Sequence, residues 1–388
     1  MENTPIHPPS SILHPRRILV RSTNWLGDAV MTAPALLRLR EKFPDAKIAI
    51  LTPKKLHELW LNHPAIDEVI SFSPDETIFA VAKKLSAGKF DLALVFPNSP
   101  RSAIEVFLAR IPQRIGCSRP WRNFFLTQTI PPRADAVKMR KLSLAEIKNR
   151  IATEAQRAQS KKINELCVLC DSVAKSKDLR HQIHEYLHLV SALGANSELL
   201  PPKLFVTSEE IEAARKKFGL DKIENPIFGL NPGAEYGAAK RWPVEKFIVA
   251  AKKIQQRTNC VWILFGGKND LAIANQIESA IRNPQSAIFN FAGKTSLREL
   301  MALLKSCRVL LTNDTGPMHV AAALDVPIVT IFGSTSPELT GPIFSDKSKI
   351  LKSDAPCSPC FLRECPIDFR CMNGIAVEKV VEAVLKSI

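Results

Sequence analysis

Short apolar runs alternate with longer amphipathic stretches along both halves of the chain. Runs of strand length occur in the first half at 17–21, 47–51, 67–72, 91–96 and 113–117. Similar runs occur in the second half at 226–230, 261–266, 287–291, 308–312 and 327–333. Helix-like patterns lie between them, for example at 34–43, 243–257 and 296–306. Apolar strands joined by helix-length connections predict parallel sheets covered on both faces, so we expect an α/β fold with two doubly wound domains in series.

The join between the domains is predicted near residues 198–210, where Pro201 and Pro202 interrupt helical patterns. We therefore expect an N-terminal domain over 1–200 and a C-terminal domain over 201–388. Residues 135–180 contain no strand pattern and are rich in Lys, Arg and Ala, which predicts a helical insertion in the first domain. Two interpretations of this insertion stay open: a functional element, or a solvated helix pair without function.

The positive charge of the chain is unevenly distributed. Residues 1–180 hold 29 Lys and Arg against 17 Asp and Glu, a net charge of +12, whereas residues 181–388 hold 24 against 21, a net charge of +3. This asymmetry predicts an anionic partner for the first half, which could be nucleic acid, a membrane surface or a phosphorylated substrate. The basic half contains no recognisable nucleic-acid-binding module, so we expect no nucleic-acid partner.

Export and membrane-spanning segments are not predicted. No apolar run approaches the roughly 20 residues of a membrane-spanning helix, and residues 1–17 lack the apolar core of a signal peptide. The nine cysteines are scattered except for Cys357, Cys360, Cys365 and Cys371, so a cytoplasmic, reducing setting is expected. Those four cysteines have a spacing that could hold zinc or form a disulfide, but a packing or redox-sensitive role is favoured.

The strongest candidate for ligand binding follows the apolar run 308–312. Asp314 comes at the end of the predicted strand, and Thr315 and Gly316 then open a helix. The free N–H groups and the dipole at a helix start favour a phosphate, and His319 lies one turn further on. An ordinary helix with Asp314 as its N-cap is the alternative, but it leaves the second loop, 332–342, at the same sheet edge unexplained.

The segment 229–247 contains another candidate loop, which is rich in glycine and carries the adjacent cations Lys240 and Arg241. A lysine in such a loop can pair with a diphosphate as a point charge. A third loop, 265–270, lacks the G-x-G-x-x-G spacing, and the chain contains no G-x-x-x-x-G-K-[ST] motif, which argues against dinucleotide oxidoreductases and P-loop enzymes.

Asp28 is the candidate in the first half. It stands between Gly27 and Ala29, where the first predicted strand passes into a helix. A carboxylate at the carboxyl end of a strand is well placed for acid–base chemistry, although capping of the following helix is an equally good interpretation.

Taken together, three of these stretches resemble glycosyltransferase family 9, the ADP-heptose:lipopolysaccharide heptosyltransferases. They are "NWLGDAVMTAPAL", "NPGAEYGAAKRWP" and "NDTGPMHVAAAL…IFGSTSPELTGP". "PNSPRSA" (97–103) and "CSPCFLRECP" (357–366) are typical of the heptosyltransferase II branch. The resemblance runs from about Arg17 to the C-terminus, whereas the insertion at 135–180 is longer and more basic than the family pattern.

The resemblance implies a GT-B architecture, in which two Rossmann-like domains face a central cleft, and an inverting reaction. The second domain would hold the nucleotide sugar, with contacts from Glu235, Tyr236, Lys240, Asp314, Thr315, Gly316 and His319. Asp28 would be the general base that takes a proton from the acceptor hydroxyl as it attacks C1 of the donor. The implied reaction moves L-glycero-D-manno-heptose from ADP-heptose to the heptosyl-Kdo2-lipid A inner core of lipopolysaccharide. The alternative is heptosyltransferase I or III, or another family member with a different acceptor.

An anionic lipopolysaccharide acceptor agrees with the basic first half. Arg101, Arg119 and Arg122 are acceptor-binding candidates on charge and position, although each could be a solvated surface arginine. The segment 119–132 mixes cations with aromatics and predicts either a membrane anchor or a core strand with a basic lead-in. We expect a monomer at the cytoplasmic face of the inner membrane that needs no cofactor and no metal, with a divalent cation at most stimulatory. A nucleotide-sugar epimerase on the same scaffold would need a second acid–base group near Asp28.

Overall fold

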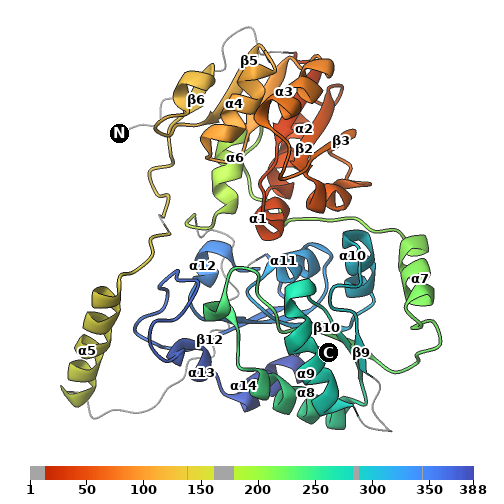
Figure 1. Cartoon of the computed structure of the whole chain (residues 1–388), viewed down its shortest axis with the longest axis vertical. Coiled ribbons are helices and arrows are strands. Elements are labelled where there is room, and N and C mark those ends of the chain that lie inside the picture. Colours follow the sequence, from red (N-terminus) through yellow and green to blue (C-terminus); the bar gives the residue numbers. More distant parts are fainter. Residues whose placement is uncertain (1–13, 138, 161–178, 283–287, 343) are drawn as a thin grey trace. The chain divides into compact units, whose positions relative to one another are not determined.

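The computed structural model describes residues 14–137, 139–160, 179–282, 288–342 and 344–388. Contacts divide the chain into two compact units (Figure 1). The N-terminal unit consists of the described residues of Met1–Ala136 and Leu179–Phe205, and the C-terminal unit consists of those of Val137–Asp178 and Val206–Ile388. Each unit has its own parallel sheet, and the two are described separately below.

The N-terminal unit contains a six-stranded parallel sheet with the strand order β3-β2-β1-β4-β5-β6. Its strands are β1 (Arg17–Arg21), β2 (Lys47–Pro53), β3 (Glu68–Phe72), β4 (Leu92–Val95), β5 (Gln113–Cys117) and β6 (Gln128–Ile130). Its helices are α1 (Leu26–Met31), α2 (Ala33–Lys42), α3 (Ile78–Ala87), α4 (Pro100–Leu108) and α6 (Ile183–Ser191), with 3-10 turns at Lys54–Trp60 and Asn123–Phe125. The chain builds the sheet outward from β1 in one direction and then returns to its other side with β4, so the strand order reverses between β1 and β4.

The C-terminal unit repeats this arrangement with the order β12-β11-β10-β7-β8-β9. Its strands are β7 (Ile227–Asn231), β8 (Val261–Leu264), β9 (Ile288–Asn290), β10 (Val309–Asn313), β11 (Ile328–Phe332) and β12 (Ser348–Lys352). Its helices are α5 (Leu144–Ser160), α7 (Ser208–Lys217), α8 (Val244–Thr258), α9 (Leu271–Ile281), α10 (Leu297–Lys305), α11 (Gly316–Ala323), α12 (Pro337–Thr340), α13 (Arg370–Asn373) and α14 (Val377–Leu385). Short 3-10 turns span Ala238–Lys240 and Lys268–Asp270. Here the strand order reverses between β7 and β10.

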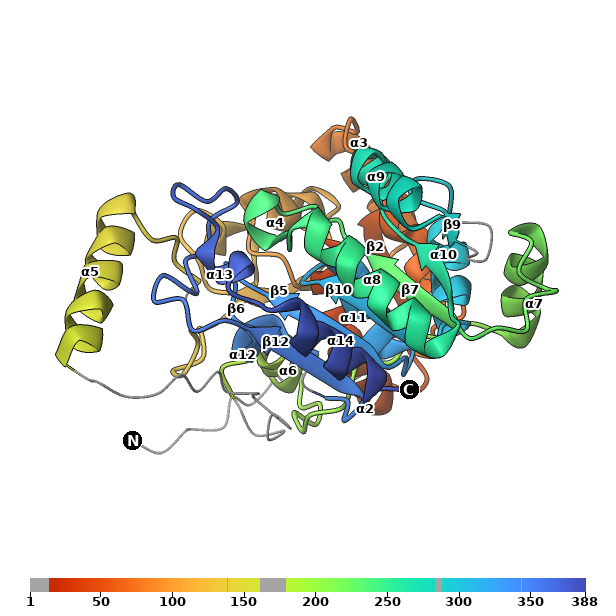
Figure 2. The same ribbon diagram turned by 90° about the horizontal axis from the view of Figure 1, so that it is seen from below.

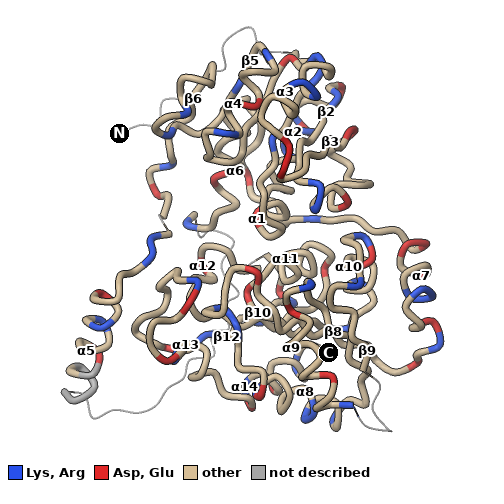
Figure 3. Tube along the Cα trace, viewed as in Figure 1, with Lys and Arg blue, Asp and Glu red and all other residues tan. Residues whose placement is uncertain are grey.

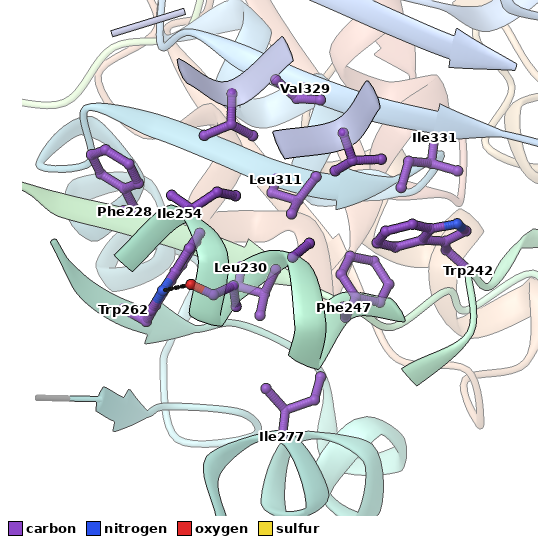
Figure 4. Packing of buried hydrophobic residues seen from close by; sticks show 14 of the residues in the cluster. Phe228, Leu230, Trp242, Phe247, Ile254, Trp262, Ile277, Leu311, Val329 and Ile331 are labelled. Carbon is purple, nitrogen blue, oxygen red and sulfur yellow. Dashed lines mark hydrogen bonds between the residues drawn. The ribbon is translucent and has the colours of Figure 1, made fainter. Parts of the chain in front are cut away.

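Apolar side chains from both layers fill the core of the C-terminal unit (Figure 4). Helices α8 and α14 lie side by side over the sheet (Figure 2). Phe247 and Ile254 of α8 contact strand residues such as Leu230 and Leu311, and all four are fully buried. The polar indole N–H inside this core is satisfied, because Trp262 Nε1 donates to the Ala251 carbonyl at 3.3 Å. Such packing fixes the strands whose ends carry the site.

The fold prediction is confirmed: both sheets are parallel and helices connect their strands. All ten predicted strands are present. The prediction missed the two edge strands β6 and β12. The insertion at 135–180, predicted as part of the first domain, contributes helix α5, which groups with the C-terminal unit because Leu142 and Ile147 pack against Cys357 and Cys360. Residues 138 and 161–178 of the insertion lie outside the described residues.

Candidate active site

Each unit places its candidate residues where its strand order reverses. In an open α/β sheet, ligands bind beyond the carboxyl ends of the strands at this switch point, because the connections diverge to opposite faces there. In the N-terminal unit, the loop after β1 leads to Asp28 and the loop after β4 is 96–99. In the C-terminal unit, the loop after β7 is 232–241 and the loop after β10 contains Asp314.

A buried ion pair joins the two switch-point loops of the C-terminal unit. Lys240 Nζ lies 2.6 Å from Asp314 Oδ2, and the side chains are 13% and 3% exposed. Thr335, in the loop after β11, donates its hydroxyl to the same carboxylate oxygen at 2.5 Å. A charged pair with so little water needs added hydrogen bonds to be stable, and Thr335 supplies one. The structure therefore brings together two of the predicted donor-binding residues and adds Thr335, which the sequence prediction missed.

Asn313, the last residue of β10, holds the 232–242 loop over this pair. Its Nδ2 donates to the Pro232 carbonyl at 2.7 Å, and its Oδ1 accepts from the Trp242 backbone N–H at 3.0 Å. One buried amide thus fixes both ends of the loop that carries Lys240. The sequence offered a weak signal for this role, since Asn313 directly precedes Asp314 at a strand end.

The start of α11 is open to an anion. Thr315 is the N-cap, and its side chain makes no capping hydrogen bond, while Asp314 is committed to Lys240. The alternative in which Asp314 caps this helix is therefore wrong. Because no side chain caps the first turn, its backbone N–H groups and the helix dipole remain available to a negatively charged ligand at Thr315 and Gly316.

His319, one turn into α11, is buried in its imidazole form. Its pKa is lowered to about 4, because burial and the charge of Lys240 together outweigh the opposing charge of Asp314. The ring is therefore neutral at pH 7. It can donate a single N–H to an anion, but it adds no positive charge to the site.

This burial predicts acid-dependent loss of stability in the C-terminal unit. Histidine in an unfolded chain takes up a proton near pH 6.5, whereas folded His319 does so only near pH 4. Between these values the unfolded state binds more protons, so the free energy of unfolding falls as the pH falls, by up to about 3 kcal/mol for this group. Urea unfolding curves from pH 7 to pH 4 should show this slope in the wild type and a smaller slope in His319→Gln. The exposed His14→Gln is the control, and an unchanged slope in His319→Gln would contradict the prediction.

The cysteine-containing segment 357–366 contacts the 232–241 loop that follows β7. The Tyr236 hydroxyl donates to the Phe361 carbonyl at 2.8 Å. Two cations contact the Tyr236 ring: Lys240 Nζ lies 5.0 Å and the Arg363 guanidinium 5.2 Å from its centroid. Gly237 has a φ of 155°, and a Cβ there would lie 2.3 Å from the Arg363 carbonyl oxygen, so only glycine fits. Glu235 is exposed on the same loop.

The four cysteines of residues 357–371 are packing residues in this structure. Cys357, Cys360 and Cys371 are buried, and burial raises the pKa of each thiol. Cys360 also accepts a hydrogen bond at its carbonyl from the Leu142 N–H at 3.0 Å. Within the described ranges, no group of three or more His, Cys, Asp or Glu side chains could hold a metal ion. The zinc interpretation therefore finds no support in the described part of the chain.

Asp28 lies in the first turn of the short helix α1 and caps no helix. The N-caps of α1 and α2 are Trp25 and Thr32. Asp28 Oδ1 is 3.5 Å from Gln182 Nε2, which also donates to the Tyr186 hydroxyl at 2.9 Å. Burial raises the pKa of Tyr186 well above its usual value, and the charge of Asp28 raises it further. The capping interpretation of Asp28 is therefore wrong, and its carboxylate remains a candidate base.

A buried charge network shapes the turn that leads to Asp28, and the sequence prediction missed it. Arg21, at the end of β1, donates from Nε to Glu105 Oε2 at 2.9 Å, and both side chains are almost fully buried. Arg21 Nη1 also donates to Asn24 Oδ1 at 3.0 Å. Arg101 donates to the other Glu105 oxygen at 3.0 Å. Glu105 thus fixes the position of Arg21, and Arg21 in turn fixes the 22–25 turn through Asn24.

The three predicted acceptor arginines occupy different environments. Arg101 is half-exposed and bonded to Glu105 and to the Glu76 carbonyl, and Arg119 is half-buried after β5. Arg122 is fully buried, and its Nη1 donates to the Pro97 carbonyl at 2.7 Å. Arg122 is therefore neither a solvated surface residue nor an exposed acceptor contact, because its guanidinium sits inside the unit.

Positive charge in the N-terminal unit is spread over many elements rather than gathered in one. Figure 3 shows Lys and Arg on several of its strands and helices. Among the described residues, no helix combines the length and the apolar character needed to cross a membrane.

Comparison with known proteins agrees with this geometry. The model of glycosyltransferase family 9 (heptosyltransferase) matches residues 139–369. Lipopolysaccharide heptosyltransferase 2 of Salmonella typhimurium is 30% identical over 87% of this chain and 88% of its own length. Lipooligosaccharide heptosyltransferase 2 of Campylobacter jejuni is 26% identical over 94% of this chain and 96% of its own length. The solved structure of E. coli ADP-heptose lipopolysaccharide heptosyltransferase II superposes with a TM-score of 0.73 at 26% identity, covering 96% of this chain and 98% of that one.

Fold, motifs and relatives define the protein as a glycosyltransferase of the GT-B class, as predicted. The chain belongs to glycosyltransferase family 9, the heptosyltransferase family.

Proposed function

We propose that this chain is an inverting heptosyltransferase that moves L-glycero-D-manno-heptose from ADP-heptose onto the heptosyl-Kdo2-lipid A inner core of lipopolysaccharide. The observation that carries the proposal is the similarity to heptosyltransferase 2 proteins across both units of the chain. The open start of α11 beside Lys240 supports it, because an ADP donor needs a site for a diphosphate.

In the proposed reaction, Asp28 accepts the proton of the acceptor hydroxyl as that oxygen attacks C1 of the donor heptose. The new C1–O bond forms as the bond from C1 to the β-phosphate oxygen breaks, and its electron pair leaves with ADP. A single displacement inverts the configuration at C1 without a covalent enzyme intermediate. Lys240 and the first-turn N–H groups of α11 stabilise the negative charge that develops on the diphosphate, and neutral His319 adds one hydrogen bond.

The donor and the acceptor belong to different units in this proposal. Glu235, Tyr236 and Asp314 of the C-terminal unit contribute to the donor site, whereas Arg101 and Arg119 of the N-terminal unit face the acceptor. Protein cations neutralise the leaving group, so the proposal includes no obligatory metal or cofactor. The enzyme acts as a monomer at the cytoplasmic face of the inner membrane, where its acceptor is anchored.

The proposal is tested by measuring heptose transfer from ADP-heptose to three kinds of acceptor: Kdo2-lipid A, heptosyl-Kdo2-lipid A, and acceptors that carry further core sugars. We expect transfer to the heptosylated acceptor alone. Transfer to Kdo2-lipid A would instead assign the chain to heptosyltransferase I, and transfer only to acceptors carrying further core sugars would assign it to heptosyltransferase III. Absence of transfer to all of them would overturn the lipopolysaccharide acceptor.

A further inference from the structure

The loop after β5 exposes aromatic side chains to solvent. Trp121 is 90% exposed and Phe124 is 82% exposed, and these are the two most exposed large hydrophobic side chains among the described residues. Both belong to residues 118–126, which we call the aromatic loop and which connects β5 to β6 (Figure 1). Exposed large apolar rings are unfavourable in water and commonly mark a contact surface.

Hydrogen bonds fix the backbone of the aromatic loop, so the exposure of its rings does not reflect loose packing. The buried Arg122 guanidinium donates to the Pro97 carbonyl at 2.7 Å and to Asn98 Oδ1 at 3.3 Å, which ties the loop to the end of β4. Asn123 Oδ1 accepts from the Arg119 backbone N–H at 2.9 Å. Trp121 itself has a φ of 66°, a left-handed conformation that is unusual for a bulky residue. The anchored backbone therefore presents the indole outward.

Arginines flank the aromatic loop along the sequence. Residues 101–133 contain six arginines and one acidic residue, Glu105, which is fully buried in its pair with Arg21. Arg110 is exposed and Arg119 is half-buried. The Arg114 guanidinium stacks 5.4 Å from the Phe107 ring, which in turn contacts Phe124. Amphipathic aromatic rings combined with arginines are the composition that binds the headgroup region of an anionic bilayer.

The sheet order places the start of the aromatic loop at the same end of the sheet as the loop that leads to Asp28. The carboxyl ends of parallel strands lie at one edge, and β5 is separated from β1 only by β4. Two strand spacings correspond to about 10 Å along this edge. The start of the aromatic loop therefore lies at the same end of the sheet as the loop that carries the candidate base, whereas Phe124 contacts Phe107 near the end of α4, the helix that leads back to the start of β5.

We infer that the aromatic loop inserts Trp121 and Phe124 into the interface of an anionic lipid bilayer and so holds the enzyme where its lipid-anchored acceptor emerges. The inference rests on the proposed function for the identity of the acceptor, but the membrane contact itself does not depend on catalysis. Arg110 would meet the lipid phosphates, while the rings enter the boundary between headgroups and acyl chains.

The test measures binding of the full chain to vesicles without donor or acceptor. Vesicles of phosphatidylglycerol and phosphatidylethanolamine are sedimented with the wild type, with Trp121→Ser/Phe124→Ser and with Phe79→Ser. Phe79 is the matched control, because it is 74% exposed on α3, outside the aromatic loop. We expect the double variant to lose at least tenfold in partition coefficient and the control to bind like the wild type. Because the replaced rings are exposed, both variants should keep the wild-type melting temperature.

A second arm separates this inference from the proposed function. Transfer to acceptor embedded in vesicles should fall at least tenfold in the double variant, whereas transfer to a deacylated, water-soluble acceptor should be unchanged. Absence of transfer to either acceptor by the wild type would contradict the proposed function but not the vesicle result. Equal vesicle binding by the double variant and the wild type would overturn the inference, as would equal losses in the double variant and Phe79→Ser. A wild-type dimer that dissociates in the double variant would assign the aromatic loop to a second copy of the chain instead.

Discussion

The Asp28→Asn variant should lose heptosyl transfer, with kcat lowered by about two to four orders of magnitude, the usual contribution of general-base catalysis. An amide has nearly the shape of the carboxylate but cannot accept a proton at neutral pH. Asp28 caps neither α1 nor α2, and its position in the first turn of α1 gives it only a modest electrostatic role in stability. The measurement is steady-state transfer to the heptosylated acceptor at saturating donor.

ADP affinity provides the control for this variant. Lys240 and the start of α11 belong to the C-terminal unit, so ADP binding measured by calorimetry should be unchanged in Asp28→Asn. The free energy of unfolding should change by less than about 1 kcal/mol, since only a first-turn charge is lost. Full activity of the variant would show that Asp28 is a structural residue, and the proposed mechanism would then lack its base.

Removing the buried carboxylate of Glu105 should destabilise the N-terminal unit strongly. In Glu105→Ala, Arg21 keeps its charge but loses its partner in a site that excludes water. Breaking such a buried pair typically lowers the free energy of unfolding by about 3–5 kcal/mol. Burial already lowers the pKa of the Arg21 guanidinium, and the charge of Glu105 is what opposes that shift. The measurement is equilibrium unfolding in urea, followed by far-UV circular dichroism.

The matched control is Glu68→Ala, which removes an ion pair with Arg17 on the same sheet. That pair spans 3.0 Å, but its side chains are 32% and 51% exposed. Water already solvates both charges, so we expect a loss below about 1 kcal/mol. Equal effects in the two variants would mean that the Arg21–Glu105 pair contributes no more than a surface pair.

Much of the fold could be predicted because the strands of a covered parallel sheet are continuous apolar runs. Strands β1 and β5 have the predicted ends, and the other eight predicted strands differ from the observed bounds by a few residues. The two missed strands lie at sheet edges. Strand β6 contains only three residues, Gln128–Ile130, and β12 reads Ser-Lys-Ile-Leu-Lys, so neither forms a long apolar run.

Single site residues that belong to sequence motifs could be predicted. Contacts between side chains that the fold brings together from distant parts of the sequence could not. The sequence singled out Lys240 and Asp314 separately, but their contact depends on β7 and β10 being neighbours. The Arg21–Glu105 pair joins residues 84 positions apart, and no periodicity in the sequence predicts it. Arg122 was a candidate acceptor contact, or alternatively a solvated surface residue, on charge and position alone, yet backbone and amide oxygens of the loop after β4 accept hydrogen bonds from its buried guanidinium.

The pairing of Lys240 with Asp314 has a consequence for turnover. In the absence of a ligand the ammonium is already neutralised by a buried carboxylate, so Asp314 acts as an internal competitor for the cation that a diphosphate needs. Under the proposed function, a diphosphate that binds Lys240 would compete with Asp314 for the ammonium, and this competition would weaken the affinity for the spent nucleotide as well as for the donor. After transfer of the sugar, the full pairing of Asp314 with Lys240 would then favour release of ADP.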